Sequence, residues 1–276
     1  MLTTHGYDVD ETPACLWNIS DPHDPRLLSV VPAARGGNNV RSAAISPDNR
    51  TLVTGAQEAL VWDISNPKKP EQRPGVSDGF RTVTELAFTG RDNTTLAIST
   101  YAAGVQLWKI GPRPARIAFV PGSTGDIGSM AVSRDGRILA AGSGDHDAYM
   151  WDVSRPAAPR LLRRLVGHTT RVWKVHLSPD GGRLLTTSLD VGAPVRLWDL
   201  TGRSPGPYAI LRGRIRAATL TGDADGIATV MTDGSMRTWH TDPDRFAVTA
   251  CGLAGAPMTA GERDLYLAPP YEPACH

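Results

Sequence analysis

The densest group of side chains able to do chemistry in this sequence is Asp145-His146-Asp147. Carboxylate oxygens and imidazole nitrogens are metal ligands, so three of them in a row are a candidate metal site. The alternative is a hairpin turn in which Asp145 is the turn residue, which leaves only two free groups. We favour the turn and expect no metal ion.

Two cysteines near the C-terminus, Cys251 and Cys275, form the second candidate. They can pair as a disulfide or as a redox-sensitive clasp, and His276 would add a metal ligand beside Cys275. A metal site would need a second closely spaced pair of ligands, which the sequence lacks. The alternative is that both are buried, reduced and apolar in character, as cytosolic cysteines usually are.

Linear motifs of known catalytic sites do not occur in the chain. There is no Gly-x-Ser-x-Gly nucleophile turn, no phosphate-binding Gly-x-x-x-x-Gly-Lys-Ser/Thr loop and no His-Glu-x-x-His zinc motif. We therefore expect no cofactor and no catalysis. An active site assembled from several strands carries no linear motif, so an enzyme remains the alternative.

Composition gives little indication of a charged partner. The formal net charge is +1, which favours neither nucleic acid nor an anionic membrane as partner. The N-terminus shows no signal peptide, and no apolar run approaches the ~18 residues of a membrane span. Only four of the 29 basic residues are lysines, a bias typical of high-GC bacterial genomes. We expect a cytoplasmic bacterial protein.

The elements that must position any site are indicated by a repeat of tryptophan. Six tryptophans end apolar strands at intervals of 45, 46, 43, 47 and 41 residues: Trp17, Trp62, Trp108, Trp151, Trp198 and Trp239. All six are followed by a polar residue, and the commonest pair is Trp-Asp. A period of roughly 40–45 residues with this pair is typical of a β-propeller built from four-stranded blades.

A second landmark has the same period. Ser or Thr residues end another set of alternating apolar runs, at spacings of 43, 44, 45 and 43: Ser46, Thr89, Ser133, Ser178 and Thr221. In the clearest case the turn reads Ser178-Pro-Asp-Gly181, in which proline presets φ and glycine accepts a positive φ. Each repeat is thus predicted to hold an inner strand, a second strand, the Trp strand and an outer strand.

These motifs resemble the WD40-repeat family, and residues 167–200 carry the resemblance best. They hold Gly167-His168, the Ser-Pro-Asp-Gly turn and Trp198-Asp199. The resemblance implies an all-β propeller of about six four-stranded blades, or an incomplete seven-bladed ring. It also implies a buried hydrogen-bonded tetrad, carried over to His168, Ser188, Asp190 and Trp198.

The strand count predicts an imperfect ring over residues 1–240. The first repeat starts at its second strand, within residues 1–6, and the last repeat lacks its outer strand, which gives 22 strands. An unpaired inner edge beside residues 1–6 would invite pairing. Either the chain's own tail covers this seam, or a longer chain or a partner supplies the missing strands.

Residues 241–276 are predicted to form a short helical tail packed on the propeller. Pro243 and Asp244 suit a helix start, and Gly255 suits a helix end. The tail is similar to the C-termini of large multidomain bacterial WD40 proteins, in which the propeller often follows a regulatory NTPase or DNA-binding module.

Alignment of the repeats predicts an interaction rim. Two columns, five and seven residues before each Ser/Thr landmark, fall at the start of the inner strand near the axial channel. One sector of this rim is aromatic and cationic: Arg41, Arg171, Trp173, Arg214 and Arg216. Trp and Arg are enriched at binding hot spots, although Trp is also a common filler at this strand position.

The favoured function is a non-catalytic scaffold that docks a protein or peptide on this rim. The alternatives are an enzyme or small-ligand binder that uses the axial channel, and a propeller fragment of a regulatory NTPase-type signalling protein.

Overall fold

The structure is a computed structural model of the 276-residue chain. It describes residues 2–4, 13–32, 40–77, 82–90, 92–100, 104–188, 190, 193–202, 207, 209–221 and 226–240. None of these residues is helical, and none of the described segments is a helix that could cross a membrane. The predicted helical tail of residues 241–276 lies outside them.

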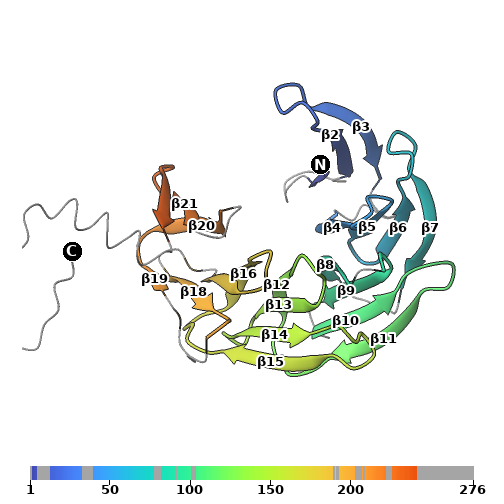
Figure 1. The fold of residues 1–276 in the computed structure, drawn as a ribbon. Helices are drawn as coiled ribbons and strands as arrows, with labels where there is room; N and C mark the ends of the chain where they lie inside the picture. Colours follow the sequence, from blue (N-terminus) through green and yellow to red (C-terminus); the bar gives the residue numbers. More distant parts are fainter. Residues whose placement is uncertain are drawn as a thin grey trace, which may run out of the picture. The chain divides into compact units, whose positions relative to one another are not determined.

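The described residues form 22 strands in six antiparallel sheets. The chain divides into two compact units, Met1–Ile215 and Arg216–His276. We number the five sheets of the first unit as blades 1 to 5 (Figure 1). Blade 1 has three strands: β1 (Leu2–Thr4), β2 (Ala14–Asn18) and β3 (Arg26–Val31).

Blades 2 to 5 have four strands each. We call them a (the inner strand), b (the second strand), c (the Trp strand) and d (the outer strand), which is also their order along the sheet. Blade 2 holds β4 (Ser42–Ile45), β5 (Thr51–Gly55), β6 (Ala59–Asp63) and β7 (Glu71–Val76). Blade 3 holds β8 (Val83–Thr89), β9 (Thr95–Thr100), β10 (Gly104–Lys109) and β11 (Ala115–Val120).

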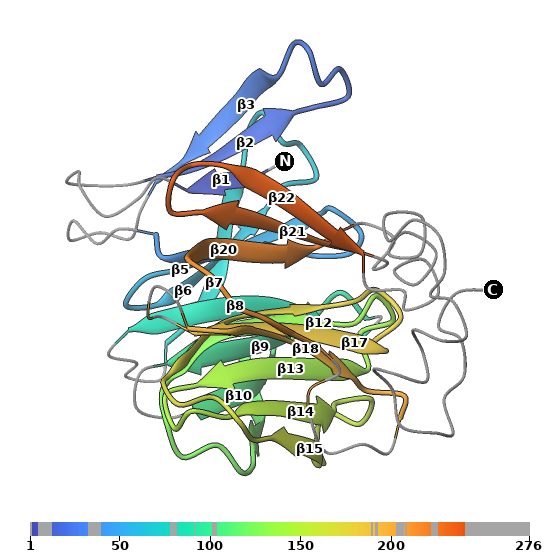
Figure 2. The same cartoon turned by 90° about the vertical axis from the view of Figure 1, so that its left-hand side faces the viewer.

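Blade 4 holds β12 (Ile127–Val132), β13 (Ile138–Ser143), β14 (Ala148–Asp152) and β15 (Arg160–Leu165). Figure 2 shows β13, β14 and β15 in succession. Blade 5 holds β16 (Val172–Leu177), β17 (Arg183–Ser188), β18 (Val195–Asp199) and β19 (Ala209–Leu211).

The remaining sheet has three strands and contains the last residues that the structure describes. They are β20 (Ile215–Leu220), β21 (Gly226–Met231) and β22 (Met236–His240). The predicted all-β architecture of four-stranded blades is confirmed. At the N-terminal end of the described residues, β1 is the edge strand of its sheet and pairs with β2 alone.

The core of the first unit lies between blades. Each of four apolar clusters joins one blade to the next; the cluster between blades 3 and 4, for example, contains Leu107 and Trp151. A blade is one sheet with two apolar faces, so it buries them only by stacking on its neighbours.

The a–b turns repeat the same local chemistry. The hydroxyl of Ser46 donates to Asp48 at 2.6 Å, and that of Ser133 donates to Asp135 at 2.7 Å. The residue after Asp adopts a positive φ in both turns, 59° at Asn49 and 73° at Gly136. This is the conformation that Asn and Gly tolerate, as the turn motif predicts.

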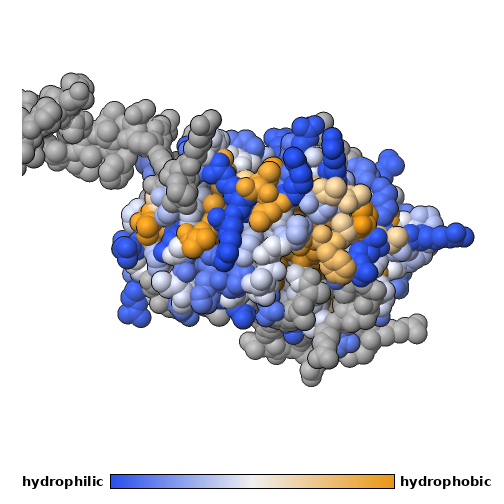
Figure 3. Space-filling view, turned by 90° about the horizontal axis from the view of Figure 1, so that it is seen from below, coloured by the Kyte–Doolittle hydropathy of each residue, from blue (hydrophilic) through white to orange (hydrophobic). Residues whose placement is uncertain are grey.

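Apolar side chains also remain on the outer strands. Phe119 of β11 is 54% exposed, and Leu161 and Leu162 of β15 are each 43% exposed. Figure 3 shows one largely hydrophilic face on which apolar residues gather in several places. Scattered apolar exposure of this kind is ordinary for a folded surface.

Close packing of neighbouring blades generates a testable prediction at Gly142 of β13. A Cβ there would lie 2.7 Å from Val172 Cγ1 and 2.9 Å from the Val172 carbonyl oxygen. Gly142→Ala should therefore force blades 4 and 5 apart and destabilise the protein by about 1–3 kcal/mol in chemical denaturation. Gly182→Ala, whose Cβ would meet side-chain atoms at 3.2 Å, is the control and should cost less. Wild-type stability of Gly142→Ala would contradict this account of the packing.

Candidate functional site

The inner strands of blades 2 to 5 bring their first residues to one place. Contacts join β4 to β8, β8 to β12 and β12 to β16. Arg41 precedes β4, Thr84 and Glu85 belong to β8, and Asp126 precedes β12. The same position in blade 5 supplies Arg171, Trp173 and Lys174. Together these residues form what we call the rim pocket.

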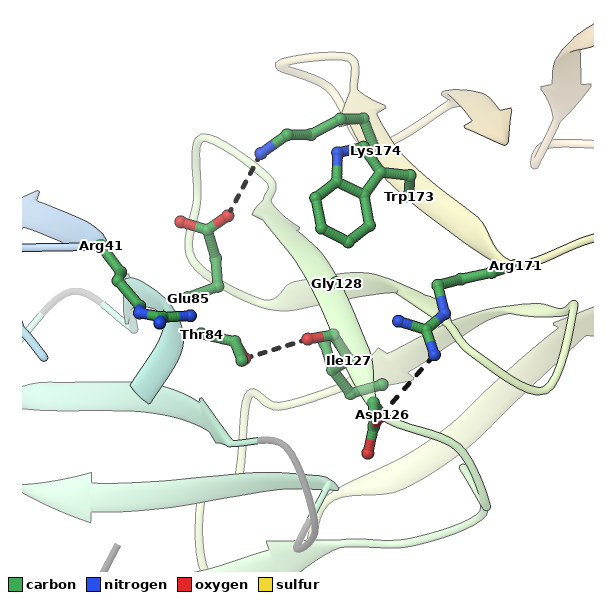
Figure 4. Close-up of a pocket in the computed structure, with 9 residues that line it drawn as sticks. All are labelled: Arg41, Thr84, Glu85, Asp126, Ile127, Gly128, Arg171, Trp173 and Lys174. Atoms are coloured by element: carbon green, nitrogen blue, oxygen red, sulfur yellow. Dashed lines mark hydrogen bonds and ion pairs between the residues drawn. The ribbon is translucent and has the colours of Figure 1, made fainter. Parts of the chain in front are cut away.

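The rim pocket is a cavity of about 110 Å³. Its lining residues are Arg41, Thr84, Glu85, Asp126, Ile127, Gly128, Arg171, Trp173 and Lys174. Figure 4 shows these side chains, which come from four successive blades. Side chains as far apart in the sequence as Arg41 and Lys174 thus meet at one site, as the column alignment predicts for Arg41, Arg171 and Trp173.

Two long ion pairs cross the pocket. Arg171 Nη2 lies 3.9 Å from Asp126 Oδ2, and Lys174 Nζ lies 3.8 Å from Glu85 Oε2 (Figure 4). Both distances exceed hydrogen-bond length, so the pairs attract without sharing a proton. A ligand can therefore accept hydrogen bonds from either cation without first breaking one.

Glu85 is the most enclosed charged group of the pocket. Burial raises the pKa of its carboxyl, against the opposing effects of the Ser42 hydroxyl and the Lys174 ammonium. Ser42 Oγ donates to Glu85 Oε1 at 2.8 Å, and the same Ser42 oxygen accepts from the Leu86 N–H at 3.0 Å. Glu85 thus links blade 2 to blade 3 at the base of the site.

Trp173 packs closely against the backbone of Gly128, which has no Cβ to keep it away. A Cβ on Gly128 would lie 3.2 Å from the Trp173 carbonyl oxygen and 3.4 Å from its ring atom Cε3. Likewise, a Cβ on Gly144 would lie 3.4 Å from Arg171 Nε. Glycine at these two positions of blade 4 lets both side chains of blade 5 lie close against the neighbouring blade.

A β-bulge explains why the sequence pattern predicted only part of the pocket. The register between the inner and second strands shifts in two blades. The shift lies between Val83 and Glu85 in blade 3, and between Val172 and Lys174 in blade 5. A bulge inserts one residue and breaks the strict two-residue alternation. Consecutive residues then reach the same pocket, whereas alternation alone would have turned Glu85 and Lys174 away.

Two predicted rim residues are absent from the lining of the rim pocket. Arg214 and Arg216 are both exposed and flank the first residue of β20, Ile215. Arg216 begins the second compact unit, which is described by itself. The role of both residues on the rim stays a prediction.

The predicted tetrad of blade 5 differs in composition from the expected set. Trp198 Nε1 donates to Thr186 Oγ1 at 2.8 Å, and this oxygen lies 2.7 Å from His168 Nε2. His168 Nδ1 lies 2.7 Å from Ser188 Oγ. Thr186, which the sequence analysis did not include, therefore joins the tryptophan to the histidine.

Asp190 lies outside this network, contrary to the expectation. It is exposed, and its backbone carbonyl accepts from the Ala193 N–H at 3.0 Å. Asp190 precedes Trp198 by eight residues, whereas Asp145 precedes Trp151 by six. The longer turn carries the carboxylate away from the histidine.

Threonine recurs as the partner of the tryptophan. Trp62 Nε1 donates to Thr54 Oγ1 at 3.1 Å, and in the second unit Trp239 Nε1 donates to Thr229 Oγ1 at 3.0 Å. Blade 4 uses a different acceptor, the Pro121 carbonyl oxygen, at 2.7 Å. A threonine in the middle of the second strand was the signal available in the sequence.

The group Asp145-His146-Asp147 is a hairpin turn between β13 and β14. The Ser143 N–H donates to the Asp147 carbonyl at 3.0 Å, and His146 has a φ of 75°. Asp145 Oδ2 accepts from Tyr149 OH at 2.8 Å. Burial alone would raise the pKa of Asp145, but hydrogen bonds from Thr124 and Tyr149 prevail and lower it to about 2.

The second carboxylate of the turn, that of Asp147, also has a partner. Asp147 Oδ2 pairs with Arg164 Nε at 2.6 Å. No cluster of potential metal ligands occurs within the described ranges. Cys251, Cys275 and His276 lie beyond residue 240 and therefore outside those ranges.

Comparison with known proteins locates the same repeats. The family model "WD domain, G-beta repeat" (WD40) matches residues 115–152 and 159–190, in blades 4 and 5 and the outer strand of blade 3. The chain is 25% identical to Autophagy-related protein 16 of Arabidopsis thaliana over 208 residues, 73% of this chain and 39% of that protein.

A second relative comes from an animal. The chain is 27% identical to Protein groucho of Drosophila melanogaster over 187 residues, 67% of this chain and 19% of that protein. The chain thus spans about two fifths and one fifth of the length of these two relatives.

The buried histidine of blade 5 predicts an acid-sensitive fold. Burial, with the nearby Arg196 guanidinium, lowers the pKa of His168 from 6.5 to about 4. A folded-state pKa below the unfolded value means that stability is full above pH 6.5 and falls between pH 6.5 and 4. The total loss is about 3 kcal/mol.

His168→Gln removes this titration. Its stability should therefore fall less steeply than that of the wild type over the same range, by up to about 1.4 kcal/mol per pH unit. Urea denaturation at pH 7.5, 6 and 5 measures the slope. His23→Gln, at an exposed position, is the control. Equal slopes for His168→Gln and the wild type would contradict the assignment.

Proposed function

Since this chain is a WD40-repeat protein, we propose that it is a non-catalytic interaction module which docks a segment of a partner protein in the rim pocket. The observation that supports this most is the meeting of Trp173 with three cations and two carboxylates from successive inner strands. Blades 2, 3 and 4 each pack between two neighbours, which makes the scaffold rigid and lowers the ordering cost of binding.

The chemistry of the pocket suits docking. Trp173 is half-buried and presents part of its ring, while Arg171 and Lys174 are 40% and 50% exposed at their side chains. Trp and Arg side chains of this kind supply most of the binding free energy at protein interfaces. Flexible charged groups around a fixed aromatic ring give orientation to the bound segment.

We further propose that the protein has no catalytic activity and binds no metal ion or cofactor. Glu85, whose pKa burial raises, is the pocket's best acid–base candidate, but its Oε1 already accepts from Ser42. We also propose a bacterial origin, from the scarcity of lysine among the basic residues, and a cytoplasmic location. The net charge of +1 supports a partner that is neither nucleic acid nor membrane.

A finer proposal concerns the first and last sheets, which have three strands each among the described residues, one fewer than blades 2 to 5. In the first unit, β1 forms a sheet edge, and an edge strand offers unpaired backbone donors and acceptors. We propose that a longer chain or a partner supplies the strands that complete these blades. Copurification of a protein with WD40-type strands would support this.

Alanine at Trp173 tests the rim pocket. Affinity purification of the intact protein from its native cell, followed by mass spectrometry, should recover a specific partner. Trp173→Ala should reduce the affinity for that partner by tenfold or more, because loss of a hot-spot aromatic costs about 2 kcal/mol or more. Titration calorimetry with the purified partner gives the number.

Phe119→Ala provides the matched control, since Phe119 is an exposed aromatic residue on the outer strand of blade 3. It should leave the affinity unchanged, and both variants should keep the wild-type circular dichroism spectrum. Unchanged capture by Trp173→Ala would remove the proposal.

A further inference from the structure

A second cavity lies on another part of the first unit, between blades 2 and 3. Its volume is about 570 Å³, within the usual range of binding sites. We call it the blade 2–3 groove. Its lining residues are Asp48, Arg50, Thr51, Val61, Trp62, Asp63, Ser65, Arg73, Pro74, Asn93, Thr94, Ile110, Gly111 and Pro112. None of them lines the rim pocket.

The groove is apolar at its base and on two walls. Val61, Trp62 and Ile110 form the base and are almost fully buried. Trp62 directs its only polar atom inward, because Nε1 donates to Thr54. Exposed prolines stand on both sides, Pro74 in β7 of blade 2 and Pro112 after β10 of blade 3. These surfaces favour an apolar side chain.

Three of the four charged groups in the groove already have partners. Asp63 Oδ2 pairs with Arg73 Nη2 at 2.7 Å. Asp48 Oδ1 accepts from the Ser46 hydroxyl and from the Arg50 backbone N–H, at 2.6 and 3.1 Å. The Arg50 guanidinium is exposed and makes no hydrogen bond or ion pair within the part of the chain that the structure describes.

Blade 4 has a different arrangement at the equivalent turn. The equivalent turn there carries Arg137, whose Nε lies 3.7 Å from Asp135 Oδ2 in an ion pair. The cavity beside that turn is of similar size, about 550 Å³, but contains Asp152 and Arg155 with two large apolar residues, Ile138 and Leu162, and neither tryptophan nor proline. At the same fold position, the arginine of blade 4 forms an ion pair within 4 Å, whereas Arg50 of blade 2 attracts the Asp48 carboxylate without such a contact.

We propose that the blade 2–3 groove binds a linear segment of a protein partner through one apolar side chain and one carboxylate. The apolar side chain lies over the base formed by Trp62 and Ile110, between the two prolines. The carboxylate accepts from the Arg50 guanidinium, which presents paired donors of matching geometry.

Side chains rather than backbone provide this recognition. β7 is the edge strand of blade 2, but Pro74 lies within it and lacks an N–H. A proline in an edge strand blocks regular strand addition. The segment therefore lies across the groove instead of extending the sheet.

Selection from a phage-displayed library of linear random peptides, with the whole protein as bait, tests the proposal. Peptides that bind the groove should carry Asp or Glu near a large apolar residue. Arg50→Gln should weaken their binding about tenfold or more in fluorescence anisotropy, because a charge-assisted hydrogen bond is lost. Arg137→Gln, the matched change in blade 4, and Trp173→Ala should leave it unchanged.

Arg50→Glu gives an independent readout, since charge reversal should abolish binding of the acidic peptides. Both substitutions are at an exposed side chain, so the melting temperature should stay at the wild-type value. The proposal is overturned if no selected peptide is sensitive to Arg50→Gln, or if the sensitive peptides contain no carboxylate. Selection of peptides sensitive only to Trp173→Ala would likewise overturn it, while leaving the rim pocket supported.

Discussion

Everything in the first unit depends on the close stacking of one blade on the next. Its core consists of four apolar layers between blades, and neighbouring a–b turns also bond directly, as where Gly90 N–H donates to the Gly136 carbonyl. The spacing is tight at the start of the inner strands β8 and β16: a Cβ on Gly55 would lie 2.6 Å from Val83 Cγ1, and one on Gly142 2.7 Å from Val172 Cγ1. A blade has no stable form without its neighbours, so the repeat is cooperative.

The rim pocket is a direct consequence of this stacking. The β-bulges of β8 and β16 occur where successive inner strands crowd together, and they turn consecutive side chains to one side. Bare backbone at Gly128 lets Trp173 approach the neighbouring blade. The blade 2–3 groove arises differently, where the turns of blades 2 and 3 meet β6 and β7, and there the Arg50 guanidinium is exposed and forms no ion pair within 4 Å among the described residues. One scaffold thus offers two chemically distinct binding surfaces.

The tryptophan and Ser/Thr periods were sufficient to predict the 22 strands of the described residues, the order of strands within a blade and the a–b turns, because these depend on local alternation and turn chemistry. Arg41, Arg171 and Trp173 were predicted to meet because alignment of repeats is equivalent to alignment in space. Glu85 and Lys174 were missed because a bulge leaves no mark in the hydrophobic pattern. Asp190 was wrongly placed in the buried network because its spacing to the tryptophan is two residues longer than the spacing in blade 4. A longer turn changes the position of the side chains that it carries. Thr186 was missed although a threonine recurs opposite the tryptophan in other repeats.

The central claim is that the partner docks where successive inner strands begin. Hydrogen–deuterium exchange of the whole protein, with and without its captured partner, tests this most directly. The account predicts slower exchange in the partner complex at Ile127–Val132 and Val172–Leu177, around the rim pocket. Unchanged exchange in these two strands, with slowing confined to outer strands such as Ala115–Val120, would contradict it.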